Sequence, residues 1–161
     1  MKKQNYTVKN IGAIIFPVLF LFCCQVHTTS AVAADYGSVN KDGAIIRSGP
    51  DIKAEALWEV FKGFPLEIVK KQKTWSKIVD FEGATGWISN QFLARTKTLI
   101  VKAKNGNLRI GPGINYEEIA LVKYGVVFEP LTREGEWFKV QVEDGPTTGW
   151  IHKDLIWPGN H

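Results

Sequence analysis

The side chains best suited to catalysis are few in this sequence and form no known catalytic pattern. Three histidines are present, and one of them, His161, is the last residue. We find no Ser-His-Asp order, no H-E-x-x-H motif and no pair of metal ligands. Asp80 and Glu82 lie beside a predicted turn, where acidic side chains commonly make local hydrogen bonds. We therefore expect a protein that is not an enzyme and that needs neither a cofactor nor a metal.

Aromatic residues offer binding chemistry instead. Grooves lined with aromatic side chains bind extended peptides, and the candidates for such a groove are Tyr116, Tyr124, Trp75 and Trp137. Trp137 directly follows a turn in "GEWFKV". One face of its ring could therefore meet solvent and a ligand, or the ring could cap the end of a small fold.

Two arginines add a possible site for a carboxylate. Arg47 and Arg109 occupy matching positions before two Gly-Pro turns. A guanidinium there could hold a ligand carboxylate through paired hydrogen bonds. Alternatively, it could tie its own loop to backbone carbonyls or to a nearby acid. Arg109 is kept as a candidate binding residue with both roles open.

The first 34 residues have the pattern of a secretory signal peptide. Three lysines precede the uncharged stretch Ile11–Cys24, and the small-residue sequence "SAVAAD" follows. Cleavage after Ala33 or after Ala34 would satisfy this pattern. The apolar stretch is shorter than the roughly 20 residues of a membrane span, and Pro17 interrupts it. We expect export to the periplasm or the exterior, with no stable membrane anchor after cleavage; a retained single-span anchor is the alternative.

Removing this segment changes the composition. The remaining 127 residues (161 − 34) contain no cysteine, because Cys23 and Cys24 lie in the removed segment. Disulfides and thiol nucleophiles are therefore excluded. Lipid attachment at one of these cysteines is the alternative, but Leu21 and Phe22 precede them where such sites normally carry small residues, so we interpret both as apolar residues of the signal. The remaining part carries 17 lysines and arginines (20 − 3) and 16 acidic residues. This nearly balanced charge argues against a nucleic-acid partner.

The rest of the chain contains an internal repeat of two similar copies. "IRSGP" (46–50) returns as "LRIGP" (108–112) at an offset of 62, and "TGWI" (85–88) returns at 148–151 at an offset of 63. Between these motifs Gly63 falls on Gly125. Such self-similarity predicts two copies of one module.

Each copy has the pattern of short β-strands. Apolar and polar residues alternate in "ALWEVFKG", and "WSKIVDFEGATGWI" and "WFKVQVEDGPTTGWI" are typical of hairpins. We expect "TGWI" to be a core strand whose tryptophan fills a small core, since a module of about 60 residues buries only about 60% of its unfolded surface. The join at Ala94–Thr98 is short, so the two modules are expected to touch or to hold a fixed relation.

These motifs resemble the bacterial SH3 (SH3b) family. "LRIGPG", a tyrosine at 116, "LVKYG", "EWFKV", "TGWI" and "DLI" follow that family's order in the second copy, and "IIRSGP" and "FKGFPLEIV" do so in the first. The resemblance covers about residues 36–157. It implies an all-β chain of two consecutive, small, partly open SH3-like β-barrels, at residues 35–94 and 95–161, after a signal peptide at residues 1–34.

The family's usual role implies binding to cell-wall material. We expect an exported, non-enzymatic module that binds peptidoglycan stem peptide; the alternative is an adaptor that docks an envelope protein. The first copy departs from the family pattern, with Ala54 where the second has Tyr116 and Asp51 where it has Gly113. The second copy is therefore the better candidate for binding. The candidate ligand-binding residues are Tyr116, Trp137, Trp75, Tyr124 and Arg109.

Overall fold

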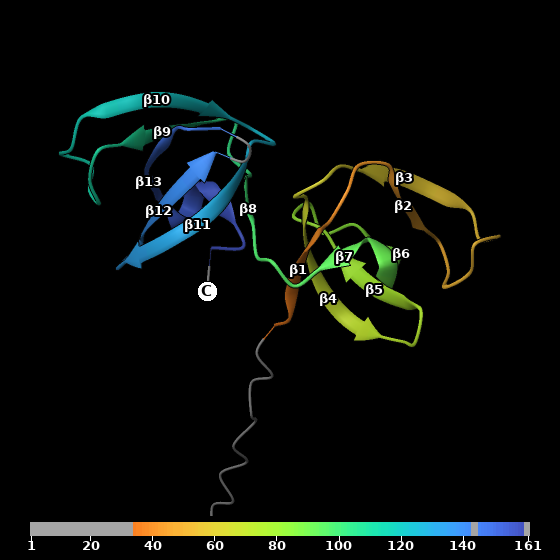
Figure 1. Cartoon of the computed structure of the whole chain (residues 1–161). Helices are drawn as coiled ribbons and strands as arrows, with labels where there is room; N and C mark the ends of the chain where they lie inside the picture. The colour runs from red at the N-terminus through yellow and green to blue at the C-terminus, as the bar shows by residue number, and fades with distance from the viewer. Residues whose placement is uncertain (1–33, 143–144, 160–161) are drawn as a thin grey trace, which may run out of the picture. The chain divides into compact units, whose positions relative to one another are not determined.

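The computed structural model describes residues 34–142 and 145–159 (Figure 1). Almost all of the expected signal peptide lies outside these residues. Within the described part the regular structure is β-strand and two short 3₁₀ helices. No described helix has the length and apolar character required to cross a membrane.

The first module is an antiparallel seven-stranded sheet with the order β3-β2-β6-β5-β4-β1-β7. Its two outer strands are not paired with each other, so the curled sheet stays open rather than forming a closed barrel. Its elements are β1 (Tyr36–Val39), β2 (Ala44–Arg47), β3 (Ala56–Val60), β4 (Pro65–Lys71), β5 (Trp75–Val79), β6 (Thr85–Ser89), the 3₁₀ helix η1 (Asn90–Phe92) and β7 (Leu93–Ala94).

The second module repeats this sheet strand for strand, with the order β10-β9-β13-β12-β11-β8-β14. The prediction of an all-β chain with two SH3-like modules is thus confirmed. Its elements are β8 (Leu99–Val101), β9 (Asn105–Arg109), β10 (Glu118–Lys123), β11 (Val127–Glu134), β12 (Trp137–Val142), β13 (Thr148–His152), the 3₁₀ helix η2 (Lys153–Leu155) and β14 (Ile156–Trp157).

The repeat also preserves turn geometry. Gly63 and Gly125 have φ angles of 80° and 83°. This left-handed region is open to glycine without steric penalty. The same turn therefore precedes β4 in the first module and β11 in the second.

Alternation along the strands builds one core in each module. Ile78 and Ile88 are fully buried in the first module, as are Val140 and Ile151 in the second. These residues face inward because side chains two apart on a strand share a face. The polar or half-buried residues between them form the outer face of each sheet.

The expectation that the "TGWI" tryptophan fills the core is wrong. In β6 the buried residues are Gly86 and Ile88, and Trp87 is half-buried on the opposite face. β13 has the same pattern, with Trp150 on its outer face. The glycine is the residue required inside, because an added Cβ on Gly86 would lie only 2.3 Å from Cγ2 of Ile46.

The join is tied to the first module, which confirms that the modules touch. Thr98 is buried, and its Oγ1 donates a hydrogen bond of 2.6 Å to the carbonyl of Gly63. Ser38 Oγ donates to the carbonyl of Thr96 at 2.8 Å. Ile100 and Val127 of the second module belong to the first module's hydrophobic cluster. These contacts leave the join little freedom.

Candidate functional site

A groove of about 580 Å³ opens on the second module. The side chains along it come from β9, β10, β12, β13, η2 and the loop after β9. Its principal lining residues are Arg109, Ile114, Leu121, Trp137, His152 and Leu155. The structure therefore brings together two predicted site residues, Arg109 and Trp137.

A smaller groove of about 340 Å³ occupies the corresponding place on the first module. Its lining includes Arg47, Ile52, Trp75, Ser89 and Phe92. At offsets of 62 or 63 residues, these are the counterparts of Arg109, Ile114, Trp137, His152 and Leu155. Trp75, the third predicted site residue, therefore lies in the first groove. We call the two surfaces the twin grooves.

Strand register places the same pair of positions at the wall of each groove. Trp75 is directly opposite Ser89 across β5 and β6, and Trp137 is directly opposite His152 across β12 and β13. The Trp137 and His152 rings meet edge to face, with centroids 5.2 Å apart. Each tryptophan begins its strand and stays half-buried, so part of its ring remains available to a ligand.

Both arginines tie their own loops, which is one of the two roles left open by the sequence. Arg47 Nη1 donates to the carbonyl of Ala54 at 2.8 Å. Arg109 Nη1 makes the matching bond to the carbonyl of Tyr116 at 2.7 Å. Arg109 Nη2 also binds Glu118 at 2.7 Å, whereas the first module has Ala56 in place of that acid. The arginine charge is thus compensated by a carboxylate in the second groove, and that carboxylate is missing from the first.

Tyr116 lies beside the second groove and packs on its own loop. An added Cβ on Gly111 would lie 2.4 Å from the tyrosine Cδ1, so the ring covers this glycine. Ala54 replaces the ring in the first module, and there the matching glycine, Gly49, has more room. Among the described residues Tyr116 is not part of the groove lining. It shapes the loop that carries Ile114.

Charged side chains surround the His152 end of the second groove. Glu136 binds Lys153 Nζ at 2.7 Å and lies 3.5 Å from His152 Nε2. The hydrogen bond from Lys153 lowers the pKa of Glu136, and the same bond raises the pKa of Lys153. Asp154 lies 3.4 Å from His152 Nδ1. Both charges of the Glu136–Lys153 pair therefore persist near neutral pH.

Tyr124 lies apart from the twin grooves, in contact with the first module. Its ring packs on Phe81 with centroids 5.4 Å apart, and its hydroxyl donates a hydrogen bond to Glu82. This bond, with burial and the nearby carboxylates, raises the pKa of Tyr124 to about 12. Of the predicted site residues, Tyr124 is the one that the fold uses in a contact between modules.

We expect an alkaline titration to detect this contact. The raised pKa means that the contact is fully stabilising below about pH 10, the ordinary tyrosine pKa, and is lost as the pH rises through about 12. The ultraviolet absorbance of tyrosinate should show one group titrating near 12 that disappears in Tyr124→Phe. Glu82→Gln should move that step towards 10; an unchanged step in this variant would contradict the assignment.

The apolar residues of the twin grooves were not predicted as site residues from the sequence. Ile52 and Ile114 lie in loops, where an isolated isoleucine gives no periodic signal, and they are 69% and 76% exposed. Leu121 lies in β10 and is 64% exposed. The available signal was the repeat itself, because each isoleucine lies the same number of residues after the arginine of its own copy.

Each of the two modules matches a model of a known protein family. Residues 40–94 match one model of the bacterial SH3 domain, and residues 104–156 match a second model with the same description. The matches together span more than half of the chain. The chain belongs to the bacterial SH3 domain family.

One curated relative combines a similar region with further sequence. This chain is 24% identical over 145 residues to the "Putative N-acetylmuramoyl-L-alanine amidase YrvJ" of Bacillus subtilis (strain 168), a match that covers 82% of this chain and 28% of that protein. This chain also resembles two solved structures and spans about half the length of each. NlpC1 from Trichomonas vaginalis is 12% identical, with a TM-score of 0.35 and coverage of 81% of this chain and 48% of that one. An NlpC/P60 family protein from Bacillus cereus ATCC 10987 is 14% identical, with a TM-score of 0.35 and coverage of 75% and 55%.

Proposed function

We propose that this chain is an exported binding protein that attaches to cell-wall peptide through the twin grooves and performs no chemistry of its own. The observation that carries the proposal is the repetition of one groove, with arginine, isoleucine and tryptophan at matching positions. We take residues 35–94 and 95–161 as the two binding modules, released from a signal peptide at residues 1–34.

The lining of the twin grooves suits an extended, partly apolar peptide. Trp75 and Trp137 each offer part of a ring, the surface on which SH3-like grooves hold extended chains. Ile52 and Ile114 provide exposed apolar contact beside them. Small aliphatic side chains of a bound peptide would pack between the isoleucine and the tryptophan.

Family membership and the relative's name favour the cell wall as the source of that peptide. The relative is named as an N-acetylmuramoyl-L-alanine amidase, and only 28% of its length matches this chain. The two matched modules are the part of the chain to which we assign this attachment.

A sedimentation assay with purified peptidoglycan tests this function. Trp137→Ala should weaken retention by about tenfold, the effect of losing about 1.4 kcal/mol at a buried aromatic contact. Leu131→Ala is the matched control, because it removes an apolar side chain of the same module that is 50% exposed and lies outside the groove lining. Its retention should change by about threefold or less, in the range of a peripheral contact.

Two outcomes would overturn the proposal. If the wild-type chain is not retained by peptidoglycan, the wall is not its ligand. Crosslinking in intact cell envelopes that captures one protein and no wall fragment would instead support the adaptor role, in which the modules dock a protein partner.

A further inference from the structure

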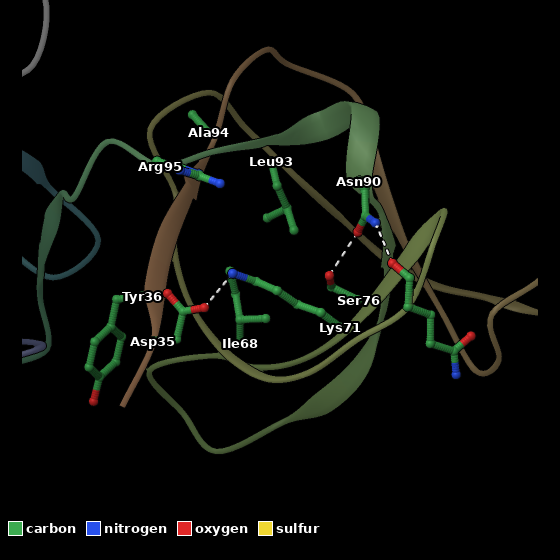
Figure 2. Close-up of a pocket in the computed structure, with 10 residues that line it drawn as sticks. Asp35, Tyr36, Ile68, Lys71, Ser76, Asn90, Leu93, Ala94 and Arg95 are labelled. Carbon is green, nitrogen blue, oxygen red and sulfur yellow. Dashed lines mark hydrogen bonds and ion pairs between the residues drawn. The ribbon is translucent and has the colours of Figure 1, made fainter. Parts of the chain in front are cut away.

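A third hollow, of about 230 Å³, lies in the first module and shares no lining residue with the twin grooves (Figure 2). It is formed by β1, β4, β5, β7 and η1. The residues used below are Asp35, Ile68, Lys71, Asn90, Leu93 and Arg95. None of them was a predicted site residue.

The hollow forms where the first module carries smaller side chains than the second. Ser76 and Ala94 line it, and at offsets of 62 and 63 their counterparts are Phe138 and Trp157. Phe138 is a core residue, 3% exposed. Trp157 packs edge to face on Tyr36, with centroids 5.4 Å apart. The first module thus has small side chains at two positions that border one hollow, where the second module has aromatic side chains.

Polar groups in the wall of the hollow are held in fixed positions. Ser76 is 1% exposed, and its Oγ donates a hydrogen bond of 2.7 Å to Asn90 Oδ1. Asn90 Nδ2 donates in turn to the carbonyl of Gln72 at 2.9 Å. Figure 2 shows these bonds along one side of the hollow. This wall is organised before any ligand arrives, which lowers the entropy lost on binding.

The opposite side carries two cations and one acid. Lys71 Nζ lies 2.5 Å from Asp35 Oδ2, and Lys71, Ile68 and Leu93 all line the hollow (Figure 2). Arg95 reaches in from the end of β7. Asp35 balances one cation, so these three groups together leave one positive charge beside an apolar floor.

We propose that this hollow is a separate binding site for a small carboxylate that carries a short aliphatic group. Arg95 and Lys71 hold the carboxylate through charge-assisted hydrogen bonds, and the aliphatic group contacts Ile68 and Leu93. The ligand is either a free short-chain acid or the C-terminal residue of a peptide. The site does not depend on the function of the twin grooves.

Amide NMR titrations of the chain from Ala33 to His161, which forms one compact unit, test the site and its ligand class. The probes are propionate, N-acetyl-alanine and N-acetyl-alanine amide. Propionate and N-acetyl-alanine should shift the backbone amide signals of Ser76, Asn90 and Leu93. N-acetyl-alanine amide should bind at least about tenfold more weakly than N-acetyl-alanine, because it lacks the carboxylate charge. Tighter binding of propionate identifies a free acid as the source, and tighter binding of N-acetyl-alanine identifies a peptide terminus. Equal binding of the acid and its amide would overturn the proposal.

Variants separate the cations from the shape of the hollow. Arg95→Ala alters an exposed side chain and should weaken acid binding by about tenfold. Ala94→Trp restores the side chain of the second module and should abolish binding. Asp35→Asn removes the competing carboxylate and should therefore strengthen acid binding. The control is Lys70→Ala, a neighbouring exposed lysine outside the lining, which should bind as wild type does. Unchanged binding in Arg95→Ala, or equal weakening in Lys70→Ala, would show that the hollow is not the site.

Discussion

Replacing Trp75 and Trp137 together by alanine is expected to lower the apparent affinity for polymeric peptidoglycan by about 100-fold or more. Two modules on one chain that bind two units of one polymer gain avidity, which can exceed either single affinity by about 10²–10⁴. The short join, held by the buried Thr98 bond, fixes the spacing between the modules. The double variant loses both the contact energy and this gain.

Comparing polymeric and monomeric ligands isolates the avidity. The single variants and the double variant are titrated against intact peptidoglycan and against a soluble fragment that carries one stem peptide. On the fragment, removing one tryptophan should leave the other groove's affinity unchanged. On the polymer, either single variant should bind about tenfold more weakly than the wild type, and the double variant about 100-fold or more. If Trp137→Ala binds the polymer as weakly as the double variant while Trp75→Ala binds as wild type does, the first groove makes no contribution.

Gly86→Ala should lower the free energy of unfolding by about 3 kcal/mol, the upper range for an overpacked core. An added Cβ would lie 2.3 Å from Cγ2 of Ile46 and 3.2 Å from the carbonyl of Arg47. Ile46 is fully buried and β-branched, so its side chain has one favoured rotamer and cannot turn away. β6 must therefore shift against β2.

The second copy of the motif provides a matched control. At Gly149 the nearest atoms are Cδ1 of Ile119 and Cβ of Leu108, each 3.0 Å from an added Cβ. Ile119 is 44% exposed and can move, so Gly149→Ala should lower the free energy of unfolding by about 1 kcal/mol. Urea denaturation followed by tryptophan fluorescence measures both variants. Equal destabilisation of the two would contradict the packing explanation.

The strands, the turns and the duplication were predictable from the sequence because they depend on local and periodic signals. The offset between "IRSGP" and "LRIGP" predicts two modules, since a repeated pattern of strands and turns folds into the same sheet twice. Gly63 and Gly125 specify the same left-handed turn, which is a property of the backbone at one residue. Alternation similarly predicts which strand residues can share a face.

Side-chain roles were less predictable, because they depend on which side chains meet across the sheet. The glycine of "TGWI", rather than the tryptophan, faces the core, and the reason is the proximity of Ile46 and Leu108 on the neighbouring strands. Tyr124 was a candidate ligand residue, but the fold places it on Phe81 and Glu82, more than 40 positions earlier in the chain. No local pattern encodes such a contact.

Residue types and their spacing along the chain specified the short strands, the turns and the duplication. Tertiary structure alone decided where the two copies differ as binding surfaces. Glu118 compensates Arg109 only because β10 pairs with β9, and Ser76 and Ala94 border a hollow only because β5 and β7 curl around one space. Charge compensation and unfilled volume are properties of neighbours in space, so they emerge only when the sheet has formed.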